Sequence, residues 1–268
     1  MADIRSRTRE IYGLEQLSGK NTLIHRRDPM VKLLSCCVYL VCLLSLDRQR
    51  VGQMSAFFLY PVVVLALAEV PFGMVLRRSL VVLPFCLMAC VGNLAVERQA
   101  VMRIGGLTIT AGMVSSLSIL LRAMLSVAAV LTLIAVTPFH QLTAALRRLH
   151  IPASFVALLE MTYRYVGALM EEASSMWAAY QLRGGGKKLD IRHMGPFAGS
   201  LLLRSFDRAE RIYGAMECRG YGSCWSRGTA QKLTAGDLLF LLAAVGSSVL
   251  FRLVDVAGWL GGVLSYWM

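Results

Sequence analysis

The sequence has few of the residues that build metal sites or catalytic centres. Its four histidines (His25, His140, His150 and His193) are scattered, and its seven cysteines show no CxxC or Cys/His ligand spacing. A bound metal ion needs several such ligands that converge. The sequence also contains no HExxH motif, no nucleophile elbow and no carboxylate pair for acid–base catalysis. We therefore expect no metal, no cofactor and no catalytic residue.

A phosphate-binding loop is missing as well. Gly186-Lys187 has Gln at position 181, where a P-loop has glycine, and no Ser or Thr follows the lysine. No strand is predicted before it. This segment is therefore not expected to bind a nucleotide.

Long apolar runs dominate the chain instead. Apolar residues make up 56% of it, and the mean hydropathy of +0.59 is far above the value of soluble proteins. A helix needs roughly 17–25 apolar residues to cross a bilayer. Runs of about this length lie at about 30–46, 54–70, 79–96, 108–136 and 235–253. We predict an all-α, polytopic helical membrane protein with about five transmembrane helices, and the C-terminal tail leaves a short sixth element open.

The distribution of charge predicts how the chain is organised. Lys and Arg number 28 against 16 acids, and between positions 137 and 233 there are 13 against 7. Basic segments tend to stay on the cytoplasmic side, so this placement favours a membrane orientation over nucleic-acid binding. The polar N-terminus lacks the apolar core of a cleaved signal peptide. The predicted parts are a cytoplasmic N-terminal segment (1–29), transmembrane helices 1–4 (30–136), a cytoplasmic domain (137–233) and the last transmembrane helix with the tail (234–268).

The predicted cytoplasmic domain is helical. Apolar residues at helical spacing predict a short helix at 140–150 and long helices at about 153–182 and 195–218. Both long helices carry charges three and four residues apart, where side chains can pair along one helix. Arg77 and Arg78 are expected in a short loop after the second span, on the same side of the membrane.

One six-residue pattern occurs near the end of each long helix. The two copies, 36 residues apart, are Ala179-x-x-x-Arg183-Gly184 and Ala215-x-x-x-Arg219-Gly220. Alanine and arginine four residues apart share a helix face, and glycine suits the left-handed position that ends a helix. Each copy therefore predicts a helix that ends in a presented guanidinium, with a small residue one turn earlier. Two unrelated amphipathic helices that end in Arg-Gly are the alternative.

Arg122 lies near the middle of the fourth apolar run. A charge at the centre of a bilayer costs about 2.5–3.5 kcal/mol on insertion scales, so this side chain should face protein or water. It either has a structural role, such as binding an interhelical carbonyl, or takes part in gating or subunit contact.

The paired motifs before the last span resemble those of the T component of energy-coupling factor (ECF) transporters, most closely the cobalt branch (CbiQ-like). The resemblance covers roughly residues 20–230. Besides the motifs, it rests on residues 27–34 (RDPMVKLL), 121–122, 137–138, 146–152 (LRRLHIP), 163–165 (YRY) and 204–211 (RSFDRAER).

The resemblance implies a non-enzymatic coupling subunit of the cell inner membrane. Two ABC ATPase subunits would each receive one arginine, Arg183 or Arg219, while Ala179 and Ala215 allow close approach. A separate substrate-binding membrane subunit would contact the spans, and the resemblance leaves room for a small accessory membrane subunit. The substrate of the assembled transporter would be cobalt ion, with nickel or a vitamin as alternatives.

Two other classes of function compete with this interpretation. A free-standing secondary transporter or intramembrane enzyme would need ionisable groups or broken helices at mid-bilayer, and only Arg122 meets that condition. A scaffold without transport would have the same helical insert but would not stimulate an ATPase.

Overall fold

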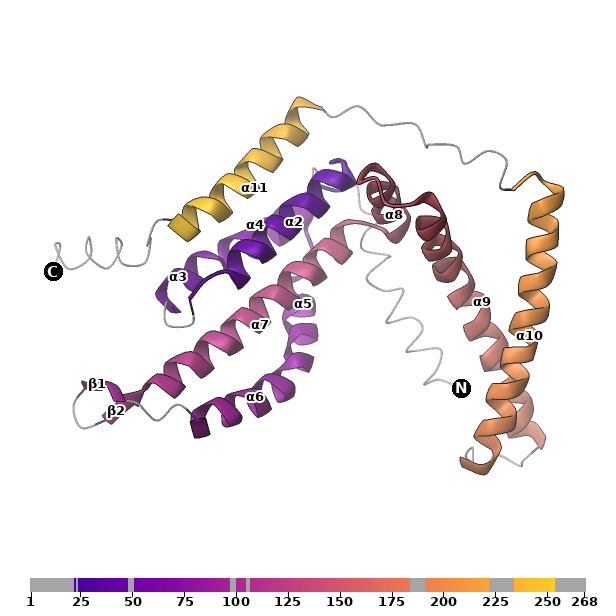
Figure 1. Ribbon diagram of the computed structural model, residues 1–268, viewed down its shortest axis with the longest axis horizontal. Helices are drawn as coiled ribbons and strands as arrows, with labels where there is room; N and C mark the ends of the chain where they lie inside the picture. The colour runs from indigo at the N-terminus through magenta and orange to yellow at the C-terminus, as the bar shows by residue number, and fades with distance from the viewer. Residues whose placement is uncertain are drawn as a thin grey trace. The chain divides into compact units, whose positions relative to one another are not determined.

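The computed structural model describes residues 22, 24–47, 51–96, 100–104, 107–183, 191–221 and 234–253, which are mostly helical (Figure 1). The chain divides into two compact units. The first, which we call the membrane unit, comprises Leu14–Leu142 and Gln231–Met268. The second, the insert unit, comprises Met1–Gly13 and Thr143–Ala230.

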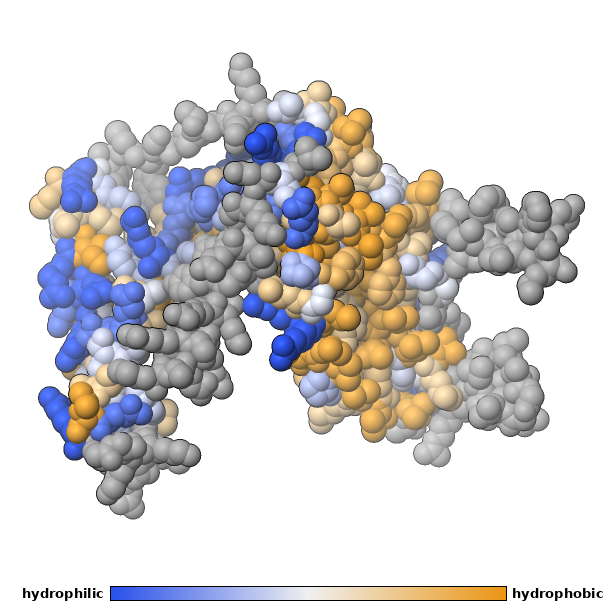
Figure 2. Space-filling model, turned by 180° about the vertical axis from the view of Figure 1, so that it is seen from behind, coloured by the Kyte–Doolittle hydropathy of each residue, from blue (hydrophilic) through white to orange (hydrophobic). Residues whose placement is uncertain are grey.

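Apolar helices form the described part of the membrane unit. They are α2 (Pro29–Leu44), α3 (Val51–Ala56), α4 (Leu59–Ala68), α5 (Phe72–Ser79), the 3-10 turn η1 (Leu80–Val82), α6 (Leu83–Val96), α7 (Ala111–Val136) and α11 (Ala235–Leu253). Among the described residues, three stretches are long and apolar enough to cross a membrane, namely Phe72–Leu94, Gly112–Val136 and Ala235–Leu253. Pro29–Leu44 and Gly52–Ala68 are shorter apolar helices. Hydrophobic side chains cover much of the face of this unit seen in Figure 2. These findings confirm the predicted all-α, polytopic membrane protein.

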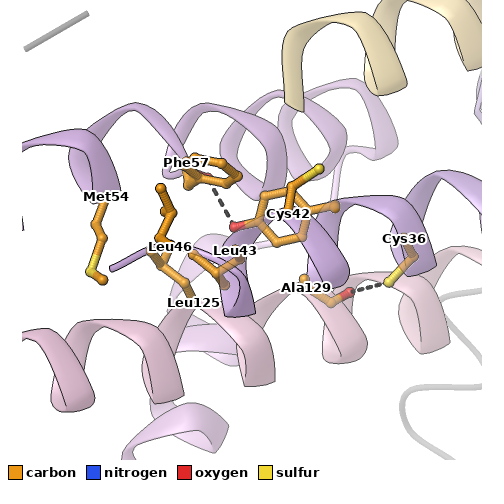
Figure 3. Packing of buried hydrophobic residues seen from close by; sticks show 9 residues of the cluster. Cys36, Cys42, Leu43, Leu46, Met54, Phe57, Leu125 and Ala129 are labelled. Atoms are coloured by element: carbon orange, nitrogen blue, oxygen red, sulfur yellow. Dashed lines mark hydrogen bonds between the residues drawn. The ribbon is translucent and has the colours of Figure 1, made fainter. Parts of the chain in front are cut away.

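Helix α7 is the centre of the membrane unit and packs against α2, α3, α4, α5 and α6. One buried cluster joins α2, the turn after α3 and α7 (Figure 3). In it the Tyr39 hydroxyl donates to the carbonyl of Phe57 at 3.0 Å, and the Cys36 thiol contacts the carbonyl of Ala129 at 3.9 Å. Buried polar groups such as these are stable only when paired. The cluster therefore fixes α2 on the face of α7.

The structure corrects two details of the predicted membrane helices. Arg77 and Arg78 lie in the last turn of α5, not in a loop, because the turn between the second and third apolar segments comes earlier, at Val70-Pro71. The fourth run does not begin as a helix. Two short antiparallel strands, β1 (Ala100–Ile104) and β2 (Leu107–Thr110), precede α7 directly.

The insert unit consists mainly of two long helices. The chain enters it through α8 (Phe139–Arg148), which crosses the boundary between the units, and continues as α9 (Ala153–Arg183) and α10 (Ile191–Cys218). The α9 prediction is confirmed. Helix α10 starts four residues earlier than the predicted Gly195 and contains Pro196, which lacks the amide hydrogen for a helical bond. Hydrophilic side chains cover much of these helices (Figure 2).

Candidate functional site

The second Ala-x-x-x-Arg-Gly motif closes α10 with a defined backbone turn. Gly220 has φ of 75°, in the left-handed region. The amide of Gly220 donates to the carbonyl of Glu217 at 2.9 Å, and the amide of Tyr221 donates to the carbonyl of Met216 at 2.9 Å. These are the two bonds of a Schellman motif, which satisfies carbonyls at a helix end. The backbone thus fixes the point at which Arg219 leaves the helix.

The first motif lies at the end of α9. Arg183 is the last residue of this helix, and Ala179 lies one turn before it. Gly184 lies outside the residues that the structure describes. The position of Arg183 matches the sequence prediction of a guanidinium at the end of the first long helix.

All four described side chains of the two arginine–alanine pairs are exposed. Ala179, Arg183, Ala215 and Arg219 each lie on the surface of the insert unit. Among the described residues, neither guanidinium has a hydrogen-bond or ion-pair partner. Arginine carries five donors in a planar fork and is always charged in proteins. Both ends therefore present a cation that the described residues of the insert unit do not neutralise.

The second motif is flanked by a local polar contact. Tyr213, two residues before Ala215, donates its hydroxyl hydrogen to the carboxylate of Glu217. The negative charge of Glu217 and this hydrogen bond raise the pKa of the Tyr213 phenol. A phenol is already neutral at physiological pH, and the neighbouring carboxylate of Glu217 strengthens this preference for the neutral form.

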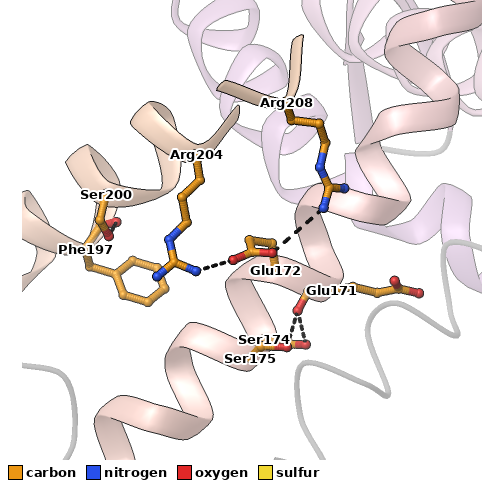
Figure 4. A network of polar contacts seen from close by, with 8 residues as sticks. All are labelled: Glu171, Glu172, Ser174, Ser175, Phe197, Ser200, Arg204 and Arg208. Carbon is orange, nitrogen blue, oxygen red and sulfur yellow. Dashed lines mark hydrogen bonds and ion pairs between the residues drawn. The ribbon is translucent and has the colours of Figure 1, made fainter. Parts of the chain in front are cut away.

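An ion-pair cluster joins α9 to α10 (Figure 4). The Glu172 carboxylate of α9 accepts from the Arg204 guanidinium of α10 at 2.5 Å, and its other oxygen lies 4.0 Å from the Arg208 guanidinium. Charges three and four residues apart predicted ion pairs along each single helix. In the structure Glu172 instead pairs with arginines of the other helix. These arginines lie 32 and 36 residues away in the sequence, so the i,i+3 and i,i+4 spacing within one helix does not predict the contact.

The crossing places the two motifs at opposite ends of the helix pair. Helices α9 and α10 run in opposite directions (Figure 1). From the crossing at Glu172 and Arg204, Arg183 lies 11 residues further along α9 and Arg219 lies 15 residues further along α10. At 1.5 Å per residue these stretches are about 16 and about 22 Å long, in opposite directions. One small binding groove is too short to receive both arginines.

Arg122 of α7 contacts the end of α2. Its two terminal nitrogens donate to the carbonyls of Leu44 at 3.2 Å and Leu46 at 2.7 Å. The last carbonyls of a helix lack intrahelical donors and carry partial negative charge. Arg122 thus satisfies backbone groups of a neighbouring helix and compensates the dipole of α2.

Comparison with known proteins identifies the family. The family model described as "Cobalt transport protein" (CbiQ) matches residues 20–229. The energy-coupling factor transporter transmembrane protein EcfT of Thermosediminibacter oceani is 29% identical over 89% of this chain and 97% of the relative. The cobalt transport protein CbiQ of Rhodobacter capsulatus is 32% identical over 41% of this chain and 47% of the relative. The nickel permease LarQ of Lactiplantibacillus plantarum is 31% identical over 43% of this chain and 42% of the relative.

The family match covers the apolar helices from α2 to α7, both long helices and both motifs, and ends before α11. The relative that matches most of the chain is named a transporter transmembrane protein. The two that match less than half of it are named a cobalt transport protein and a nickel permease. Together with the helical membrane fold, these matches show that the chain belongs to the CbiQ family of cobalt transport proteins, the T components of ECF transporters.

Proposed function

We propose that this chain is the non-catalytic coupling subunit of an ECF importer, with two ABC ATPase subunits bound at Arg183 and Arg219. The observation that carries the proposal is the pair of exposed guanidiniums at opposite ends of the α9–α10 pair, neither of which is paired with a described residue. Their separation favours two separate docking sites. One motif for each ATPase accounts for the duplication of the pattern.

Each arginine is suited to a groove that offers carboxylates or backbone carbonyls. The guanidinium fork donates several hydrogen bonds in fixed directions, and such bonds to charged acceptors are stronger than neutral ones. Ala179 and Ala215 lie on the same face one turn earlier and are exposed. A methyl side chain lets the backbone of the helix approach a partner closely. ATP-driven movement of the two ATPases would then reach α9 and α10 directly.

The proposed membrane orientation and substrate rest on charge and on the relatives. We place the N-terminus, α8, α9 and α10 on the cytoplasmic side of the inner membrane because basic residues collect there. The apolar helices would contact a separate substrate-binding membrane subunit. Cobalt ion is the proposed substrate of the assembled transporter, supported by the family model. Nickel is the alternative, since LarQ is named a nickel permease.

Co-purification with the ATPase subunits tests the proposal. The double variant Arg183→Glu/Arg219→Glu should reach the membrane in normal amounts but lose both ATPases. Replacing a hydrogen-bonded interfacial charge should weaken binding by about 30-fold or more. Arg164→Glu is the matched control, because Arg164 is an exposed arginine of α9 outside the motif. Normal recovery of both ATPases with the double variant would contradict the proposal.

A further inference from the structure

Three charged side chains are buried together where α2 and α11 begin and α7 ends. Asp28, Lys32 and Asp237 expose 6%, 3% and 5% of their surface. The carboxylates of Asp28 and Asp237 both act electrostatically on the ammonium of Lys32. Charges are buried at such a position only when partners compensate them.

Lys32 holds the end of α7. Its ammonium donates to the carbonyl of Val136 at 3.4 Å and to the carbonyl of His25 at 3.1 Å. Val136 is the last residue of α7, and its carbonyl belongs to the group that a helix leaves unsatisfied at its C-terminus. A cation at that end also compensates the helix dipole. Lys32 thus joins the turn before α2 to the point where α7 stops.

Asp237 holds the start of α11. One carboxylate oxygen accepts from the amide of Thr234 at 3.0 Å, as in a capping box. The other accepts from the amide of Asp28 at 3.4 Å and pairs with the Arg27 guanidinium at 3.6 Å. Asp237 thus joins the first turn of α11 to the residues that precede α2.

The Arg27 guanidinium lies close against Gly236. A β-carbon at this position would meet a terminal nitrogen of Arg27, so any side chain here must displace the end of Arg27. Asp28 completes the arrangement because its carboxylate accepts from the amide of Met30 at 2.9 Å and so caps α2.

The two helix ends held here are also the places where the chain leaves and re-enters the membrane unit. The insert unit comprises Thr143–Ala230, so α7 is the last membrane helix before it and α11 the first one after it. Both connections are therefore fixed to one short segment, residues 25–32, by charges that lie within the membrane unit.

We infer that Lys32 and Asp237 are positioning residues of a shared anchor that transmits movement of the insert unit to α2, α7 and α11. The inference rests on the proposed coupling function. Because both connections end at the same buried charges, a displacement that enters through α8 or through the segment before α11 acts on these three helices together.

Hydrogen exchange of the purified full chain in lipid nanodiscs tests the anchor itself. Lys32→Met and Asp237→Asn each remove one buried charge, and each should speed amide exchange at both 133–137 and 234–238 by about tenfold or more, because local opening becomes easier. Exchange at 121–129, in the core of α7, should not change. Arg26→Met is the control, since it removes a charge from an exposed neighbour in the same turn. Faster exchange at only one of the two helix ends, or at neither, would overturn the inference.

A milder variant keeps the test decisive if removal of a buried charge prevents folding. Gly236→Ala displaces only the flexible end of Arg27 and leaves Lys32 and Asp237 in place. It should speed exchange at 234–238 by a smaller factor, about threefold, because one exposed-side ion pair is lost. Unchanged exchange in this variant would show that Arg27 does not contribute to the anchor and would contradict the arrangement described.

Function is then measured in proteoliposomes that contain the chain, its ATPases and the substrate-binding subunit, with radioactive Co²⁺ and Ni²⁺ as probes. Lys32→Met and Asp237→Asn should retain the ATPases and their hydrolysis of ATP but import at least about tenfold fewer ions per ATP. A parallel fall in hydrolysis and import would indicate a purely structural role and overturn the inference. Arg183→Glu/Arg219→Glu tests the proposed function through ATPase binding, whereas the Lys32 and Asp237 variants test the anchor through ions imported per ATP. Either result can therefore fail without the other.

Discussion

Glu172 of α9 and Arg204 of α10 lie 2.5 Å apart, carboxylate oxygen to guanidinium nitrogen, between the two helices that carry the Ala-x-x-x-Arg-Gly motifs. Arg208 approaches the same carboxylate at 4.0 Å. The side chain of Arg204 is 61% exposed, so water screens the pair. Such a contact contributes only about 0.2–1 kcal/mol of stability. It can therefore favour one crossing angle of α9 and α10 without holding the two helices rigidly.

Reversal of this charge should alter coupling more than folding. Glu172→Arg places three arginines together at the crossing and should lower stimulation of the ATPases several-fold, with the amount of protein in the membrane unchanged. The triple variant Glu172→Arg/Arg204→Glu/Arg208→Glu restores opposite charges and should recover much of the activity. The ATPase rate at low salt measures both effects, since salt screens exposed pairs. No recovery in the triple variant would show that the ion pairs do not set the crossing.

The two alanines should not tolerate larger side chains although they lack chemical function. Ala179→Leu and Ala215→Leu insert bulk into a close contact, and overpacking costs about 1–3 kcal/mol, or about five- to 150-fold in affinity. Serine at either position should have almost no effect. Binding of the ATPases to chains immobilised in nanodiscs provides the measurement. Normal binding of both leucine variants would mean that close approach is not needed.

Arg122 should contribute to the stability of the membrane unit and not to ion import. Arg122→Met removes the donors to the carbonyls of Leu44 and Leu46. Leu44 is exposed but Leu46 is buried, and an unsatisfied buried acceptor costs about 1–3 kcal/mol. The midpoint of thermal unfolding in detergent should fall, and lysine should restore only part of it because it lacks the planar fork. An unchanged midpoint together with loss of ion import would instead favour the gating role.

The purified chain should bind no transition-metal ion tightly. Within the described residues no group of three or more His, Cys, Asp or Glu side chains could hold a metal ion. Soft and borderline ions need such ligands deprotonated and convergent. Calorimetric titration with Co²⁺ and Ni²⁺, without partner subunits, measures this. A stoichiometric submicromolar site would favour a free-standing transporter, and Arg122 and the histidines would be re-examined first.

Local sequence signals predicted which segments are helical but missed some of their ends. The third apolar segment begins at Phe72 and not at 79, and α10 begins at Ile191 and not at Gly195. The apolar runs located the membrane helices, and the glycine after Arg219 predicted the left-handed turn that the structure has at Gly220. The β1–β2 hairpin was missed although Gly105-Gly106, between two short segments that contain β-branched residues, is a known hairpin signal. The length of the apolar run that follows it outweighed this signal.

The contacts between distant segments could not be predicted. Asp237 binds the amide of Asp28 across 209 positions, and Arg122 binds the carbonyl of Leu44 across 78. A single sequence shows the charged residue but not which group it contacts, because that contact depends on how whole helices pack against one another. The sequence therefore predicted the presented arginines of the candidate site but neither the α9–α10 crossing nor the buried anchor.

The mass of the assembled complex tests the central claim most directly. Native mass spectrometry of the nucleotide-free complex should show two ATPase subunits on the unaltered chain. Arg183→Glu and Arg219→Glu should each yield complexes with one ATPase fewer, and the double variant none, because each arginine serves its own docking site. Two ATPases on the double variant would contradict the account.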